Sequence, residues 1–296
     1  MILLKGAHQT GKTSLVARAL ARSRTGGKKA VVTDIQKLRL DRLGEIEAFL
    51  HALACSLADS LELDLGVETA WESRRLASSN FERFLKRALG GKRERVVWAI
   101  DEVDRIFPYP YASEFFGLLR AWHNESALNP GSHWQRLTIL IAYATEAHLF
   151  IADANQSTFN VGSKFELLDF TREQVAALNT LYGSPADERG ISELHTLLNG
   201  HPELPQRALY ELATHRHSLS DLAKSATNEV GPFSDHLRHL LVSLEERPEL
   251  LNSVREMLRG AATMPTDHFY RLRAFGILGG DRARDATPRS AGSSPS

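Results

Sequence analysis

The sequence lacks the features that mark secreted and membrane proteins. It has one cysteine, Cys55, among 296 residues, so no disulfide can form within the chain. Cys55 lies in a helical pattern of apolar residues, where a packed core thiol is expected. The longest apolar stretch, residues 139–144, is far too short to span a membrane, and the apolar residues before Lys5 are too few for a signal peptide. These absences predict a soluble protein of the reducing cytoplasm that has no membrane partner.

Neither sign of charge dominates the composition. Lysine plus arginine and aspartate plus glutamate number 36 each, so the chain has no global attraction to nucleic acid. One basic cluster, Lys92, Arg93 and Arg95, precedes an apolar run, and we interpret it as the solvated approach to a strand. We therefore do not expect nucleic acid to be a partner. The length is sufficient for two or three compact units.

The most informative stretch lies near the start of the chain. Residues 6–13 match the pattern G-x-x-x-x-G-K-[ST], between an apolar run that predicts a strand and a helical pattern over residues 14–20. The glycines allow the backbone to turn around an anion, so that N–H groups at the helix start point to phosphate oxygens. A chance glycine turn capping a helix is the alternative. The predicted nucleotide-binding residues are Gly6, Ala7, His8, Gln9, Thr10, Gly11, Lys12, Thr13 and Ser14.

Two residues of this loop have separate predicted roles. Lys12 would reach the β- and γ-phosphates of the nucleotide. The Thr13 hydroxyl would take a coordination site on Mg²⁺. The predicted cofactors are therefore ATP or ADP with Mg²⁺.

A second signal is the apolar run over residues 96–100, which ends in the acids Asp101 and Glu102. This is the pattern of a buried parallel strand with carboxylates at its C-terminal tip, where open α/β sheets bind ligands. Asp101 would hold the Mg²⁺, and Glu102 would orient and deprotonate the attacking water. Asp104 is the weaker member of the acidic run. Without the phosphate loop, the acids could equally be a helix N-cap.

A third predicted strand, residues 137–143, leads to Thr145 at the same sheet edge. A polar side chain there can sense the γ-phosphate, so Thr145 is a candidate catalytic residue. A plain strand-end turn is an equally good interpretation.

Later motifs resemble those of a known family. Residues 156–162 (Gln-Ser-Thr-Phe-Asn-Val-Gly), 168–174 and 198–202 (Leu-Asn-Gly-His-Pro), together with the two nucleotide motifs, resemble bacterial AAA-like domains of the STAND class. These are signal-transducing P-loop ATPases. The resemblance implies that His201 and Pro202, at the start of a lid helix, pack near the adenine or the phosphates. A helix start with proline in its first turn is the simpler interpretation of the same residues.

The chain departs from this family pattern at three points. Family members usually carry residues ahead of the first strand that help to cover the base, whereas this sequence begins at the strand. Thr158 stands where a proline is usual. No arginine is clearly placed as an arginine finger, and Arg120, Arg136 and Arg172 are candidates.

The predicted architecture is an α/β fold with several parts. A P-loop NTPase core with a parallel sheet covers residues 1–168, a helical lid residues 169–228, and a truncated winged-helix-like unit residues 229–279. Residues 280–296 have no large apolar side chain, so we expect a disordered tail that cannot form a wing hairpin. An apolar face would then remain exposed and bind a partner or a second copy of the chain; its residues are Leu272, Phe275, Ile277 and Leu278.

The leading functional hypothesis is an ATP-binding switch that hydrolyses ATP slowly and signals through movement of its lid and winged-helix-like units. One alternative is a scaffold that binds nucleotide without turnover and acts through protein interactions. A second is a DNA-binding regulator that uses residues 269–278, where Arg271 and Arg273 are the only basic residues. A protein partner or a homo-oligomer is expected in the first two cases.

Overall fold

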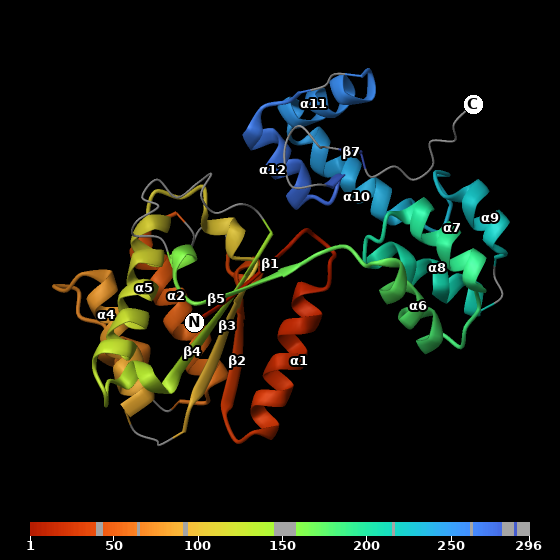
Figure 1. The fold of residues 1–296 in the computed structure, drawn as a ribbon. Helices are drawn as coiled ribbons and strands as arrows, with labels where there is room; N and C mark the ends of the chain where they lie inside the picture. Colours follow the sequence, from red (N-terminus) through yellow and green to blue (C-terminus); the bar gives the residue numbers. More distant parts are fainter. Residues whose placement is uncertain are drawn as a thin grey trace. The chain divides into compact units, whose positions relative to one another are not determined.

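The structure, a computed structural model, describes residues 1–39, 44–63, 66–90, 94–144, 158–214, 217–260, 263–279 and 287–288. The chain divides into two compact units. The first comprises Met1–Lys5 and Lys12–Glu166, and the second comprises Gly6–Gly11 and Leu167–Ser296. Figure 1 shows a sheet flanked by helices in the first unit and a set of helices in the second.

A five-stranded sheet organises the first unit, and its strand order is β2-β3-β4-β1-β5. The pairs β2 with β3, β3 with β4, and β1 with β4 are parallel, which confirms the predicted α/β class. Parallel strands bring their carboxyl ends to one edge of the sheet. The strands are β1 (Ile2–Gly6), β2 (Lys29–Asp34), β3 (Val96–Asp101), β4 (Leu137–Tyr143) and β5 (Ser163–Leu167).

Helices cover both faces of this sheet. Helix α1 packs on one face, and α2, α4 and α5 lie on the other (Figure 1). Because helices cover both faces, β3 is buried at every position and reads as a continuous apolar run. The helices are α1 (Lys12–Thr25), α2 (Ile46–Ser60), α3 (Val67–Ala70), α4 (Ala77–Gly90) and α5 (Ala112–Leu128).

Aromatic side chains fill the layer between β3 and the helices. Trp98 is fully buried, and its indole N–H donates to the Thr33 hydroxyl at 3.0 Å, which ties β3 to β2. The Trp98 ring packs edge-on against Phe81 of α4, with the ring centroids 6.2 Å apart. Cys55 is half-buried and packs against this core, close to its expected place. The position of β3 is therefore fixed by packing on both sides.

Helices make up most of the second unit. They are α6 (Arg172–Leu181), α7 (Glu188–Leu198), α8 (Glu203–Ala213), α9 (Leu219–Ser225), α10 (Ser234–Glu245), α11 (Pro248–Leu258) and α12 (Thr266–Ala274). The short strands β6 (Leu278–Gly279) and β7 (Thr287–Pro288) follow. None of the helices in the described ranges is both long and apolar enough to cross a bilayer.

Two hydrophobic clusters lie in this unit. One gathers side chains of α7, α8 and α9 together with Phe233, and the other gathers Leu244, Leu250, Phe269, Leu272 and Leu278. Two clusters suit a helical lid followed by a separate small unit. The boundary between residues 228 and 229 stays a prediction, and Phe233 packs with the helices before it.

Two predictions about the end of the chain are wrong. Leu272 and Leu278 are 0% and 1% exposed, because α10 and α11 contribute Leu244 and Leu250 to cover them. Phe275 and Ile277, the other two residues of the predicted exposed face, are half-buried. Thr287–Pro288 pairs antiparallel with Leu278–Gly279, so these two residues do form a minimal hairpin ladder. The predicted disorder of the tail concerns residues 280–286 and 289–296, which lie outside the described residues.

The N-terminus of α6 provides a test of the local structure. Thr171 Oγ1 accepts the Gln174 N–H at 3.3 Å, and Gln174 Oε1 accepts the Thr171 N–H at 2.9 Å, a complete capping box.

Thr171→Ala removes the cap and should lower the stability of α6 by about 1 kcal/mol. Amide protection in α6 should therefore fall roughly fivefold in hydrogen exchange. Thr180→Ala, on the same helix and exposed, is the control and should leave protection unchanged. Equal exchange in both variants would show that the capping box contributes nothing.

Candidate nucleotide-binding site

The phosphate loop runs from the end of β1 to the start of α1 and is closed by its own contacts. Thr10 Oγ1 donates to the Ala7 carbonyl oxygen at 2.8 Å. A Cβ at Gly6 would lie 2.7 Å from Thr10 Oγ1 and 2.9 Å from the Leu167 Cβ, so only glycine fits there. Gly11 has a φ of +93°, a conformation that side chains rarely adopt. The two motif glycines are therefore required by the backbone path.

Lys12 begins α1 and is only 5% exposed. Burial lowers the pKa of its ammonium group, and the carboxylates of Asp104, Glu102 and Asp101 act in the opposite direction. A buried ammonium needs such partners, because an unpaired charge away from water is costly. Lys12 thus lies close to three acids at the start of the helix, where the backbone N–H groups also favour an anion.

One hydrogen bond joins the two nucleotide motifs. The Thr13 hydroxyl donates to Asp101 Oδ2 at 2.8 Å across 88 positions of sequence. Asp101 is 3% exposed, and its other carboxylate oxygen accepts the Glu102 N–H at 3.0 Å. Thr13 is exposed at the mouth of the loop. The structure therefore brings together the two residues that were predicted to hold Mg²⁺.

Glu102 has an unusual backbone conformation. Its φ of 56° and ψ of 37° lie in the left-handed region, which for a side-chain residue costs on the order of 1 kcal/mol. The side chain is half-buried, and burial raises the pKa of its carboxyl group, while Lys12 lowers it. The charges of Asp104, Asp101 and Asp34 raise it further. Strain of this kind is often found at functional sites.

Asp104 has a larger structural role than its sequence position suggested. Its two carboxylate oxygens accept the Ala144 N–H at 3.0 and 2.8 Å, which joins the turn after β3 to the end of β4. It also comes first among the charges that raise the Lys12 pKa. The Asp-Glu-x-Asp run was visible in the sequence, but the contact with a residue forty positions later was not. Thr145, the candidate sensor that follows, lies outside the described residues.

Asp34 was not predicted as a site residue. It is the last residue of β2 and is in register with Asp101, so two strands end in aspartate side by side. Its side chain accepts the Gln36 N–H at 2.9 Å and caps the short helix that follows. An acid at the end of the second predicted strand is the signal that could have identified it.

Residues 6–11 of the loop belong to the second unit, and His8 has neighbours there. The His8 N–H donates to the Ala274 carbonyl oxygen at 2.8 Å, and the His8 ring stacks on Phe275 at 5.5 Å. Gln9 has a φ of 62°, a further left-handed position in the loop.

His201 and Pro202 also lie in the second unit, at the turn before α8. Gly200 has a φ of +71°, and its carbonyl oxygen accepts the Phe170 N–H at 2.8 Å. His201 is 1% exposed and packs against the ring of His236 at 5.1 Å. His236 Nδ1 in turn lies 3.0 Å from the Glu203 carboxylate. The implied role of this turn toward the base or phosphates stays a prediction.

The oxygen atoms near the loop are ligands of the kind that a divalent cation such as Mg²⁺ prefers. The Thr13 hydroxyl and the Asp101 carboxylate are oxygen ligands of the kind that Mg²⁺ takes together with nucleotide phosphates and water. Among the described residues, no group of three histidine, cysteine, aspartate or glutamate side chains could hold a metal by itself.

Comparison with known proteins identifies the family. A family profile described as an AAA-like domain matches residues 1–287. The chain belongs to the AAA-like domain family. No curated protein matches the sequence significantly.

Solved structures of similar fold agree with this assignment. A Walker-type ATPase of Pyrococcus abyssi is 15% identical with a TM-score of 0.57, over 98% of this chain and 88% of that one. The ORC2 protein of Aeropyrum pernix, solved in ADPNP–ADP complexes, is 13% identical with a TM-score of 0.53, over 97% and 84%. At these identities the likeness shows the P-loop ATPase fold alone.

The comparisons do not support the expectation that nucleic acid is no partner. The ORC1 protein of Aeropyrum pernix, solved in complex with DNA, is 15% identical over 94% of this chain and 78% of that one. Its TM-score of 0.46 is too low to carry an argument in either direction.

The anchor made by Asp104 can be tested directly. Ala144 is 4% exposed, so Asp104→Ala leaves a buried N–H without its acceptor, which should cost about 1–3 kcal/mol. Asp104→Asn keeps an acceptor oxygen and should retain most of that stability. Hydrogen exchange at the end of β4 should therefore accelerate at least about tenfold in the alanine variant and much less in the asparagine variant. Unchanged exchange in both would refute the anchoring role.

Proposed function

We propose that this AAA-like domain is a signal-transduction ATPase of the STAND class that binds ATP or ADP with Mg²⁺ and hydrolyses ATP slowly. The hydrogen bond between Thr13 and Asp101 is the observation that carries the proposal, because it joins the phosphate loop to the acidic strand end. The ADPNP–ADP complexes of the structurally similar ORC2 protein support these nucleotides. The single cysteine suits a cytoplasmic location.

Each residue at the start of α1 has a defined task in binding. Lys12 points its ammonium among acids and would exchange part of that pairing for the β- and γ-phosphates. Thr13 and Asp101 would hold Mg²⁺, which neutralises developing charge on the phosphoryl oxygens when bound. The N–H groups of the first helical turn would complete the anion site. No acidic side chain occupies that turn to oppose an anion.

Glu102 is the proposed general base. It follows the metal-holding acid directly, is half-buried, and has a fixed left-handed backbone that sets the direction of its side chain. It would orient a water molecule toward the γ-phosphate and accept its proton. Thr145, which follows β4 in the sequence, would contact the γ-phosphate.

The switch is proposed to act through the helical second unit. The lid helices and the winged-helix-like segment would change their packing as ATP is exchanged for ADP, which would alter the surface offered to a protein partner. His201 and Pro202 would take part near the nucleotide. A nucleotide-binding scaffold without turnover is distinguished from this proposal by the hydrolysis experiment below.

Lys12→Ala tests nucleotide binding. The variant removes the charge that faces the β- and γ-phosphates, so ATP affinity measured by calorimetry should fall roughly a hundredfold, about 2–3 kcal/mol. Arg18→Ala is the matched control, because Arg18 is an exposed cation on the same helix. Equal affinity for ATP in the wild type and in Lys12→Ala would rule out this site.

Glu102→Gln tests turnover. The amide keeps the shape of the side chain but cannot accept a proton, so the variant should bind ATP with near wild-type affinity and lose hydrolysis by about 100-fold or more. Glu114→Gln, at an exposed position on α5, should hydrolyse ATP like the wild type. Hydrolysis by Glu102→Gln at the wild-type rate would require another base. A wild type that binds ATP and never hydrolyses it would favour the scaffold.

A further inference from the structure

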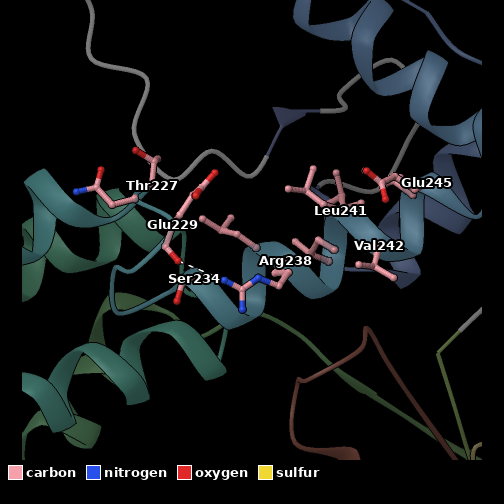
Figure 2. A pocket seen from close by; sticks show the side chains of 12 residues that line it. Thr227, Glu229, Ser234, Arg238, Leu241, Val242 and Glu245 are labelled. Carbon is pink, nitrogen blue, oxygen red and sulfur yellow. Dashed lines mark hydrogen bonds between the residues drawn. The ribbon is translucent and has the colours of Figure 1, made fainter.

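A groove runs along α10 in the second unit. Its volume is about 630 Å³, and it is lined by one face of α10, the segment before that helix, and Ile277 (Figure 2). Figure 2 shows Arg238, Leu241, Val242 and Glu245 following one another along the helix. The residues that line it include Thr227, Glu229 and Ser234 near one end.

Apolar side chains at the middle of this face are exposed. Leu241 is 56% exposed and Val242 is 50% exposed, although both lie in the central part of the helix. Leu237 and Leu240 are half-buried beside them, and Leu244 reaches the hydrophobic cluster below. Exposed apolar side chains thus stand on α10, beside Ile277 of the segment that the sequence had predicted to be exposed. A face of this kind usually marks an interaction site.

Opposite charges stand at the two ends of the face. Arg238 and Glu245 are seven residues apart, which places them about 20° apart around the helix and about 10 Å apart along it. Both are exposed. Leu241 and Val242 occupy the midpoint between them. Along the helix the face therefore presents Arg238, which lies beside the exposed Asp235, then the apolar side chains, and then Glu245.

The α10 faces of two copies of the chain are complementary to each other when the two helices run antiparallel. A two-fold axis that passes between Leu241 and Val242 sets two copies of α10 antiparallel, as in an isologous interface. Arg238 of each copy then lies opposite Glu245 of the other, and the apolar side chains meet at the centre. A parallel arrangement would instead place like charges together, which is unfavourable.

We propose that the α10 face, defined by Arg238, Leu241, Val242 and Glu245, is the interface of an antiparallel homodimer. The second copy is the occupant that this charge pattern selects, since it supplies both the acid and the cation at matching positions. The proposal is independent of the nucleotide chemistry.

The contacts that these charges already make within the chain are weak. Arg238 lies 3.7 Å from Asp235, with the two side chains 66% and 95% exposed, and its guanidinium donates to the Glu229 carbonyl oxygen at 3.4 Å. Exposed ion pairs of this length are easily exchanged for others. Within the described residues, no salt bridge within 4.0 Å engages Glu245, so its carboxylate is available to a second copy.

Sedimentation velocity on the full chain at low salt tests the interface. Because one helix pair buries a small area, we expect a weak dimer with a dissociation constant on the order of tens of micromolar. Arg238→Glu and Glu245→Arg should each place like charges together and weaken the dimer by about a hundredfold. Leu241→Asp should do the same by placing a carboxylate at the apolar centre.

Mixing the two charge variants gives the sharpest result. In a one-to-one mixture of Arg238→Glu and Glu245→Arg, each cross-contact of the antiparallel dimer pairs opposite charges again. The mixture should therefore form a heterodimer with near wild-type affinity, although each variant alone is monomeric. The double variant Arg238→Glu/Glu245→Arg should likewise dimerise.

Two control variants guard against general effects of charge and surface change. Arg189→Glu reverses an exposed arginine that has a local partner on α7, and Leu181→Asp replaces an 83% exposed leucine on α6. Both should dimerise like the wild type. A wild type that stays monomeric at about 500 µM, dimers unaffected by the α10 variants, or a mixture that remains monomeric would each overturn the proposal.

Discussion

Burial of the Lys12 ammonium group is the constraint on which the site depends. A cation that is 5% exposed at the start of a helix must be balanced by nearby negative charge. The carboxylates that balance it come from the end of β3 and the turn that follows. They can reach it because β4 pairs in parallel with both β1 and β3, so that the carboxyl ends of these strands lie at one edge of the sheet. The fold thus places three carboxylates near one ammonium group at the loop, and the additional negative charge would favour a nucleotide that carries a metal ion.

The same edge explains why strain is tolerated there. Glu102 adopts a left-handed backbone between Asp101, whose carboxylate is held by Thr13, and Asp104, whose carboxylate is held by the Ala144 amide. Two anchored neighbours fix the residue between them. If Glu102 is the base, as we propose, a backbone held in this way lowers the reorganisation needed to orient a water molecule.

The sequence predicted the parts of this site whose chemistry is local. Gly6, Gly11 and Lys12 follow from the spacing that a phosphate loop requires, and Asp101 follows from the end of a buried strand. The hydrogen bonds from the Ala144 N–H to the Asp104 carboxylate could not be predicted in the same way, because they depend on the pairing of β3 with β4. The burial of Leu272 and Leu278 was missed for a similar reason. The expectation assumed that only a wing hairpin could cover them, whereas α10 and α11 do so.

The central claim is that Thr13 and Asp101 act together on a nucleotide-bound Mg²⁺. The most direct measurement is the ATP dissociation constant with Mg²⁺ and with a chelator, for the wild type and for Thr13→Val, which removes only the hydroxyl. The account predicts that Mg²⁺ tightens binding to the wild type about tenfold or more and that most of this gain is lost in the variant. Equal ATP affinity with and without Mg²⁺ in the wild type, or an undiminished Mg²⁺ effect in Thr13→Val, would contradict it.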